Sequence, residues 1–127
     1  LPFTISQAAH ELEVSTNHLV KVVNFMGHQG WIITSRGRSG GMRLAKSPSE
    51  YRLGTLIRIL EERDTGTVQI VNCSAPLCPL VPHCQLNSLL QDAVQAFTDY
   101  LDRFTLLDAV RNPAALQQLI RIPVHLA

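Results

Sequence analysis

The sequence predicts a mainly α-helical protein with one small β-hairpin, and three observations carry that prediction. Two short helical patterns follow each other closely near the N-terminus. A basic, glycine-rich stretch flanked by two apolar runs comes next, and a long apolar repeat of helical spacing occupies the C-terminal half. At 127 residues the chain can bury one modest core, which a partner subunit could extend.

The first two helices are predicted from their caps and their apolar periodicity. Thr4 and Gln7 have the spacing of a capping box at the start of a helix over residues 5–12. Ser15 is a second N-cap candidate, and the helix that it begins should end near Gly30. Two helices this close in sequence form a helix-turn-helix, whose second helix enters the major groove of DNA. The buried stripe of that second helix consists of Leu19, Val22, Val23 and Met26.

Polar side chains at the start of the second helix are the candidates for contacting DNA bases. Asparagine can pair bidentately with adenine, while lysine and histidine can reach guanine or phosphate. On this segment alone, the alternative is an ordinary helical hairpin with a polar outer face. The candidates are Ser15, Thr16, Asn17, His18 and Lys21.

A β-hairpin with a basic tip is predicted directly after the helix-turn-helix. Its strands are the runs at residues 31–34 and 42–45, which the stretch SRGRSGG joins. Glycines in the tip allow the backbone to approach a phosphate ridge or a minor groove closely. Such a hairpin is the wing of a winged helix, and a solvated surface hairpin is the alternative. The DNA-binding candidates in it are Arg36, Gly37, Arg38, Ser39 and Arg43.

Charge is divided unevenly along the chain, although the net charge is only +1. Residues 1–58 carry seven lysines and arginines against three glutamates, or +4, and the remainder carries four arginines against seven acidic residues, or −3. A basic half indicates a polyanionic partner such as double-stranded DNA. No apolar run is long enough to span a membrane and no secretory signal is visible, so we expect a cytoplasmic protein with no membrane partner.

All three cysteines, Cys73, Cys78 and Cys84, lie in the proline-rich stretch VNCSAPLCPLVPHC. An odd number of cysteines without an export signal argues against a disulfide framework. Zinc sites usually pair cysteines that are roughly two to four residues apart and use four ligands, which this stretch does not offer. Gaps of four and five residues suit three thiolates around an iron–sulfur cluster. A redox-switching thiol loop, a zinc site and a loop without metal are the alternatives.

A helix over residues 54–62 is predicted before this cysteine stretch, and a helix of about 20 residues after it. The long helix repeats apolar residues at intervals of four and three, which is a heptad seam, and Leu89, Val94 and Leu101 are extra apolar positions. We expect a second, symmetry-related copy of the chain to bury this seam, and packing against residues 105–120 is the alternative. The seam consists of Leu86, Leu90, Ala93, Phe97, Tyr100 and Phe104.

The end of the chain should form a turn capped by Thr105 and a short helix that begins at Pro113. The predicted organisation is then a winged helix-turn-helix domain over residues 1–62, an iron–sulfur cluster loop over residues 63–84, and a dimerisation helix with a tail over residues 85–127. An enzyme is not predicted. A small redox enzyme would use a tight C-x-x-C pair near a βαβ unit, and neither feature is present.

Four stretches carry a resemblance to a known family: VSTNHLVKVVN, GWIITSRGRSGGMRLAKSPSEYRLG, VNCSAPLCPLVPHCQL and FTDYLDRFTLLDAV. They resemble the Rrf-type winged-helix repressors, and within that family the NsrR group of nitrite-sensitive, nitric-oxide-responsive repressors. The cysteine stretch discriminates within the family. Cluster-biogenesis regulators have one more residue in the first gap and a histidine ligand three residues after the last cysteine, where this chain has Asn87.

The resemblance implies a homodimer in which Cys73, Cys78 and Cys84 bind an iron–sulfur cluster near the dimer interface, as 4Fe–4S in preference to 2Fe–2S. Residues 15–21 and 36–43 would contact a palindromic operator. Nitric oxide would nitrosylate the irons and release the repressor from promoters of nitric oxide detoxification genes. A metal-free thiol-redox regulator, or an iron–sulfur-biogenesis regulator of the same family, is the alternative function.

The resemblance also implies a helix ahead of the helix-turn-helix. In the family this helix supports the DNA-binding unit and can offer an acidic fourth ligand to the cluster of the opposite subunit. The sequence starts at Leu1 without such a segment. We therefore expect an N-terminal segment to be missing from it.

Overall fold

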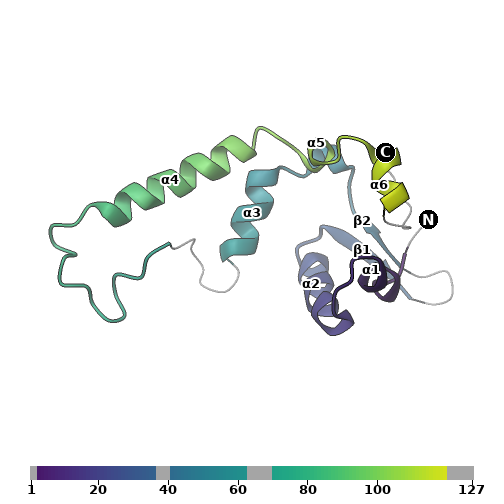
Figure 1. The fold of residues 1–127 in the computed structure, drawn as a ribbon, viewed down its shortest axis with the longest axis horizontal. Coiled ribbons are helices and arrows are strands. Elements are labelled where there is room, and N and C mark those ends of the chain that lie inside the picture. The colour runs from purple at the N-terminus through teal and green to yellow at the C-terminus, as the bar shows by residue number, and fades with distance from the viewer. Residues whose placement is uncertain (1–2, 37–40, 63–69, 120–127) are drawn as a thin grey trace. The chain divides into compact units, whose positions relative to one another are not determined.

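The computed structural model describes residues 3–36, 41–62 and 70–119 (Figure 1). It is mainly helical with a two-stranded antiparallel sheet, as the sequence predicts. Its contacts group the chain into two compact units, of which the first comprises Leu1–Glu50 with Leu107–Ala127 and the second comprises Tyr51–Leu106. We refer to these as the N-terminal unit and the helical-hairpin unit.

The helix-turn-helix consists of α1 (Ile5–Glu11) and α2 (Thr16–His28). Thr4 and Gln7 form the predicted capping box, since the N–H of Gln7 donates to Thr4 Oγ1 over 3.1 Å and the N–H of Thr4 donates to Gln7 Oε1 over 2.8 Å. Ser15 Oγ caps α2 by accepting from the N–H of His18 over 3.4 Å. Both predicted helices are thus confirmed, with ends that differ from the prediction by one or two residues.

The two helices end in the same way, in a Schellman motif whose left-handed residue turns the chain out of the helix. After α1 this residue is Glu13, with φ 55°, and the N–H of Val14 donates to the carbonyl of Ala9 over 3.0 Å. After α2 it is Gly30, with φ 74°. Glycine adopts this conformation freely, whereas it costs a residue with a Cβ roughly 1–2 kcal/mol. The turn between α1 and α2 is therefore strained at Glu13.

The predicted hairpin is present as β1 (Ile32–Ser35) and β2 (Gly41–Leu44), each displaced by one residue from its prediction. The register pairs Ile32 with Leu44 and Ser35 with Gly41. Trp31 is excluded from β1 because it belongs to the turn that ends α2. There its ring meets Phe25 edge-on, with 5.8 Å between the ring centroids.

The core of the N-terminal unit lies where α1, α2 and the hairpin meet. The N–H of Met42 donates to the carbonyl of Phe3 over 2.8 Å, which ties the start of the chain to β2. This core covers one side of α2, so the other side remains available for contacts. The buried residues are Ala8, Val23, Ile32 and Met42, with Phe3, Ile5, Leu19, Met26 and Leu44 packed against them.

The helical-hairpin unit is built from α3 (Leu53–Glu62) and α4 (Leu86–Leu101), which pack against each other (Figure 1). Gly54 lies at their point of closest approach. A Cβ at this position would overlap the carbonyl oxygen of Thr98 and come within 2.8 Å of Asp102 Oδ1. The absence of a side chain at Gly54 therefore permits the backbones of α3 and α4 to approach closely.

Asp102, the C-cap residue of α4, also caps the N-terminus of α3. Its Oδ1 accepts from the N–H of Thr55 over 2.6 Å and from the Thr55 hydroxyl over 3.0 Å. A carboxylate is favourable at a helix N-terminus because the first N–H groups there lack partners in the helix. Arg52 Nη1 adds a bond to the carbonyl of Asp102 over 3.3 Å.

Backbone hydrogen bonds complete this junction. The N–H of Leu53 donates to the carbonyl of Phe104 over 3.0 Å, and the N–H of Leu106 donates to the carbonyl of Tyr51 over 2.9 Å. We name residues 51–55 with 102–106 the clasp. It ends α4 at Leu101, so the predicted helix of about 20 residues is too long and the seam position Phe104 lies beyond the helix.

The end of the described chain contains α5 (Leu106–Ala109) and α6 (Pro113–Leu119), which agrees with the predicted turn and short helix. Asn112 caps α6, since its Oδ1 accepts from the N–H of Ala115 over 3.1 Å. Residues 63–69 of the predicted cluster loop lie outside the described residues. Across the residues that the structure does describe, no helix is long and apolar enough to cross a membrane.

Candidate functional site

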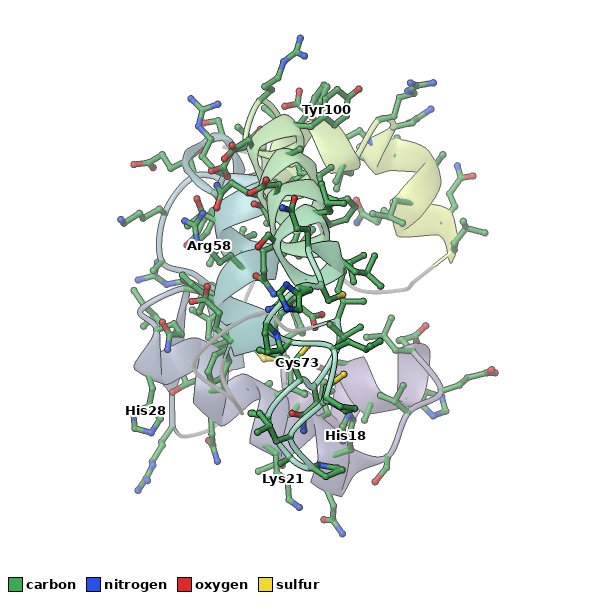
Figure 2. All side chains as sticks on the ribbon, turned by 90° about the vertical axis from the view of Figure 1, so that its left-hand side faces the viewer. His18, Lys21, His28, Arg58, Cys73 and Tyr100 are labelled. Atoms are coloured by element: carbon green, nitrogen blue, oxygen red, sulfur yellow. The ribbon has the colours of Figure 1, made fainter. Side chains whose placement is uncertain are left out.

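The first turns of α2 expose the side chains that the sequence predicts to contact bases. Thr16, Asn17, His18 and Lys21 are all exposed, and His18 and Lys21 are labelled in Figure 2. The fifth candidate, Ser15, is exposed as well, but its hydroxyl is engaged as the N-cap of α2. The structure therefore presents a polar helix N-terminus whose orientation is fixed by the core on the opposite side.

The polar face of α2 continues beyond the predicted residues. Asn24 and His28 are exposed and follow Asn17 and Lys21 at spacings of three and four residues, which places all four on one side of the helix. Sequence reasoning stopped at Lys21. The same periodicity that identified the buried stripe could have identified Asn24 and His28 as its polar counterpart.

The hairpin places basic side chains in the same unit as α2, which packs against β1. Arg43 is exposed between two covered neighbours in β2, because successive residues of a strand point to opposite faces. Arg36 follows β1 and is also exposed. The remaining wing candidates, Gly37, Arg38 and Ser39, lie outside the described residues.

The cysteine loop, residues 70–85, precedes α4 and lacks helices and strands in the structure. Cys73 and Cys78 are half-buried, whereas Cys84 is exposed (Figure 2 labels Cys73). The N–H of Cys78 donates to the carbonyl of Cys73 over 2.9 Å, which closes a turn over residues 73–78. The loop therefore brings two of its three cysteines to the ends of one closed turn.

Asn72 is a loop residue that sequence reasoning missed. Its Oδ1 accepts from the N–H groups of Ser74 and Ala75, each over 3.1 Å, and from the Ser74 hydroxyl over 3.3 Å. Its Nδ2 donates to the carbonyl of Ala75 over 3.3 Å. An asparagine before a turn commonly bonds the backbone that follows it, and this signal was present in the sequence.

The three cysteines provide suitable ligand atoms for an iron–sulfur cluster, because thiolates are the soft ligands that such clusters use. Within residues 3–36, 41–62 and 70–119, no three histidine, cysteine or acidic side chains are placed so that they could share one metal ion. The ligand chemistry thus fits the predicted cluster, while the described residues offer no three-ligand site for a single metal ion.

Helix α4 has two apolar faces. One lies toward α3 and includes Val94, Thr98 and Leu101, which are buried or half-buried. The other face, which we name the exposed stripe, is uncovered in the single chain, with Leu86, Leu89, Phe97 and Tyr100 between 55% and 61% exposed. The exposed stripe consists of Leu86, Leu89, Ala93, Phe97 and Tyr100.

The C-terminal end of the exposed stripe is an aromatic cluster. The Tyr100 ring lies 5.5 Å from the Phe104 ring, measured between centroids, and the Arg103 guanidinium lies 5.4 Å from the Tyr100 centroid. Leu90 of the predicted seam is half-buried, and Leu89 takes its place among the exposed side chains. An apolar face of this kind on a small protein marks an interaction surface.

Residues 1–112 match the model of the Rrf2 family, which is described as an iron-dependent transcriptional regulator. This match covers the winged-helix elements, the cysteine loop and α4. The chain belongs to the Rrf2 family. It is therefore a transcriptional regulator of the Rrf2 type, and the predicted family resemblance is confirmed at that level.

Two solved structures resemble this Rrf2 regulator in fold. IscR from T. potens is 20% identical with a TM-score of 0.60, and the match covers 87% of this chain and 69% of that one. CymR (YrzC), the global cysteine regulator of B. subtilis, is 24% identical with a TM-score of 0.60, and the match covers 85% of this chain and 77% of that one. At such identities the likeness shows the shared fold.

Proposed function

We propose that this Rrf2 regulator is a repressor of the NsrR type, which binds a palindromic operator as a homodimer and responds to nitric oxide through an iron–sulfur cluster. The observation that carries the proposal is the N-terminal unit, in which the exposed first turns of α2 and the basic hairpin are joined by one hydrophobic core. Membership of a family of transcriptional regulators supports it.

The DNA contacts are divided between α2 and the wing. Asn17, His18 and Lys21 contact base edges or nearby phosphates from the first turns of α2. Arg36 and Arg43 contact phosphates from the hairpin, together with the predicted residues of the wing tip, Gly37, Arg38 and Ser39. Ser15 and Thr16 contribute at the helix N-terminus, where backbone N–H groups favour a phosphate.

A second copy of the chain covers the exposed stripe. Phe97 and Tyr100 are large side chains that a soluble monomer would leave in water, and burying each one removes apolar area that stabilises an interface. A symmetric pair of α4 helices gives an isologous contact, and the resulting homodimer presents two copies of α2 to the two halves of a palindrome.

Cys73, Cys78 and Cys84 hold the cluster in this proposal, as 4Fe–4S in preference to 2Fe–2S. When bound, a cluster supplies iron atoms with which nitric oxide reacts. The contribution of this chain is to hold the thiolates in a loop that leads directly into α4. A change in the conformation of the loop is thereby transmitted to the helical-hairpin unit. The gaps of four and five residues support the nitric oxide signal, with detoxification genes as the targets.

A metal-free thiol-redox regulator is the second candidate. It is favoured by one observation, namely that Cys73 and Cys78 share a closed turn. In that case one pair of cysteines would form a disulfide and the third would be dispensable. An iron–sulfur-biogenesis regulator would use a histidine where this chain has Asn87.

The sensing proposal is tested by adding nitric oxide to anaerobically purified protein while visible absorbance and operator binding are followed together. We expect a coloured protein that binds its operator tightly and releases it as the absorbance changes. Serine at any of the three cysteine positions should remove most of the iron. Equal operator affinity with intact, nitrosylated and absent cluster would contradict the proposal, and iron-independent switching that needs two cysteines would favour the thiol regulator.

The DNA surface is tested with one wing variant and one helix variant. Arg36→Ala should weaken binding to all DNA sequences. It should also reduce the slope of the logarithm of the binding constant against the logarithm of the salt concentration by about one, because the loss of one phosphate contact lowers the number of counterions released. Asn17→Ala should lose discrimination at one base position, by about 1–3 kcal/mol. Binding is measured by fluorescence anisotropy over a salt series. Arg111→Ala, an exposed arginine outside the helix-turn-helix and hairpin, is the control and should bind like the wild type.

A further inference from the structure

We propose that Asn72 is the positioning residue of the cysteine loop, and that its side chain holds Cys73 and Cys78 in one turn before any cofactor binds. The inference rests on the proposed function, because it takes the three cysteines as ligands. Asn72 itself would not touch the cofactor. Its role is to shape the backbone from which two of the ligands extend.

The need for such a residue follows from the composition of the loop. Pro76, Pro79 and Pro82 carry no N–H and interrupt any regular pattern of backbone hydrogen bonds. A loop without helix or strand has few other means of holding one conformation, and fixing each residue costs roughly 1–2 kcal/mol of conformational entropy. Side-chain bonds to the backbone must supply the order that secondary structure supplies elsewhere.

Asn72 supplies those bonds to the first half of the turn, at Ser74 and Ala75. Three donors converge on its Oδ1, at 3.1, 3.1 and 3.3 Å, and its Nδ2 returns a bond to the carbonyl of Ala75. The second half is closed by the 2.9 Å bond from the N–H of Cys78 to the carbonyl of Cys73. Every one of these bonds lies within residues 72–78, so the turn is organised locally and without a cofactor.

Cys84 lies outside this organised turn. It is exposed, and it follows two short turns in which Val81 N–H donates to Cys78 and His83 N–H donates to Leu80. The structure therefore organises the backbone around two of the three cysteines. Two ligands are held in advance and the third joins them, which lowers the entropy lost when the full set is assembled.

The test uses iron release from anaerobically reconstituted full-length chain in the presence of a chelator, followed by visible absorbance. Asn72→Ala keeps all three thiols but removes four hydrogen bonds, and we expect iron to be released about tenfold faster. Asn72→Asp keeps an oxygen that can accept from the N–H groups of Ser74 and Ala75, so we expect release near the wild-type rate.

Two further variants serve as matched controls. Ser74→Ala removes only the hydroxyl bond to Asn72 and leaves both backbone bonds, so it should release iron slowly, as the wild type does. Asn87→Ala changes an exposed asparagine of α4 outside the turn and should do the same. Thermal melting of the variants should coincide with that of the wild type, because Asn72 is exposed and belongs to neither helix packing nor the buried core.

Cys73→Ser separates this inference from the function on which it rests. If Cys73→Ser keeps its iron as the wild type does, the cysteine ligand set itself is wrong. If Cys73→Ser loses its iron but Asn72→Ala releases iron at the wild-type rate, the positioning role of Asn72 is overturned. It is also overturned if Asn72→Asp behaves like Asn72→Ala, because the acceptor oxygen would then be irrelevant.

Discussion

Replacing Gly54 with alanine is expected to destabilise the protein by about 1–3 kcal/mol, the usual cost of forcing extra atoms into a packed contact. The added Cβ would overlap the carbonyl oxygen of Thr98 and come within 2.8 Å of the Asp102 backbone nitrogen. Both of these atoms are backbone and cannot turn away as a side chain could. The helices α3 and α4 must therefore separate, although alanine is intrinsically about 1 kcal/mol better than glycine in a helix.

Gly27→Ala is the matched control for this prediction. It makes the same change in a helix, but apart from its chain neighbours and the backbone of its own helix no atom lies within 4 Å of the added Cβ, so the intrinsic preference for alanine should act alone. We expect Gly27→Ala to raise the free energy of unfolding by up to about 1 kcal/mol, while Gly54→Ala lowers it. Urea denaturation followed by circular dichroism measures both. Equal stabilisation by the two substitutions would show that α3 and α4 do not approach as described.

Replacing Phe97 with aspartate is expected to convert the proposed homodimer to a monomer. Phe97 belongs to the exposed stripe and is 57% exposed in the single chain, so the substitution places a charge where a second copy should exclude water. An unpaired buried charge costs several kcal/mol, and the two α4 helices can avoid that cost only by separating. Operator affinity should fall when the dimer is lost, because the two half-sites are then bound by independent monomers.

Sedimentation equilibrium and operator binding measured on the same samples decide this prediction. Ser88→Asp adds the same charge to an exposed position of α4 that lies on neither apolar face, and it should leave the protein dimeric. A Phe97→Asp protein that sediments as a dimer would place the interface elsewhere. A monomer that retains full operator affinity would instead show that operator binding does not depend on dimerisation.

Sequence patterns predicted the helices well where a local signal fixes each end. Thr4 and Ser15 cap the helices that they were expected to cap, and Pro113 begins the last one. The end of α4 was missed because the apolar repeat continues through Phe104, whereas the helix stops at Leu101. What ends it is the clasp, a contact between segments far apart in sequence, which no local pattern reveals.

For the candidate site, the structure bears on the exposure of the residues, and their contacts with DNA and metal stay predictions. Exposure of Asn17 and Lys21 follows from the Ser15 cap and the buried stripe, so both could be named in advance. The cysteine set came from composition and spacing, which identify possible ligands but not their arrangement. The role of Asn72 depends on the conformation of the turn that follows it, and Gly54 matters only because Thr98 approaches it.

The clasp also sets the order in which the helical-hairpin unit can become stable. During synthesis α3 emerges long before Asp102, so the N–H of Thr55 stays uncapped until α4 has been made and has returned to it. A nascent chain that stops short of Asp102 lacks this cap, the bond from the N–H of Leu53 to Phe104 and the bond from the N–H of Leu106 to Tyr51. We therefore expect α3 and α4 to become stable together. The cysteine loop leads directly into α4, so we expect its C-terminal end to be held in place only once this contact has formed.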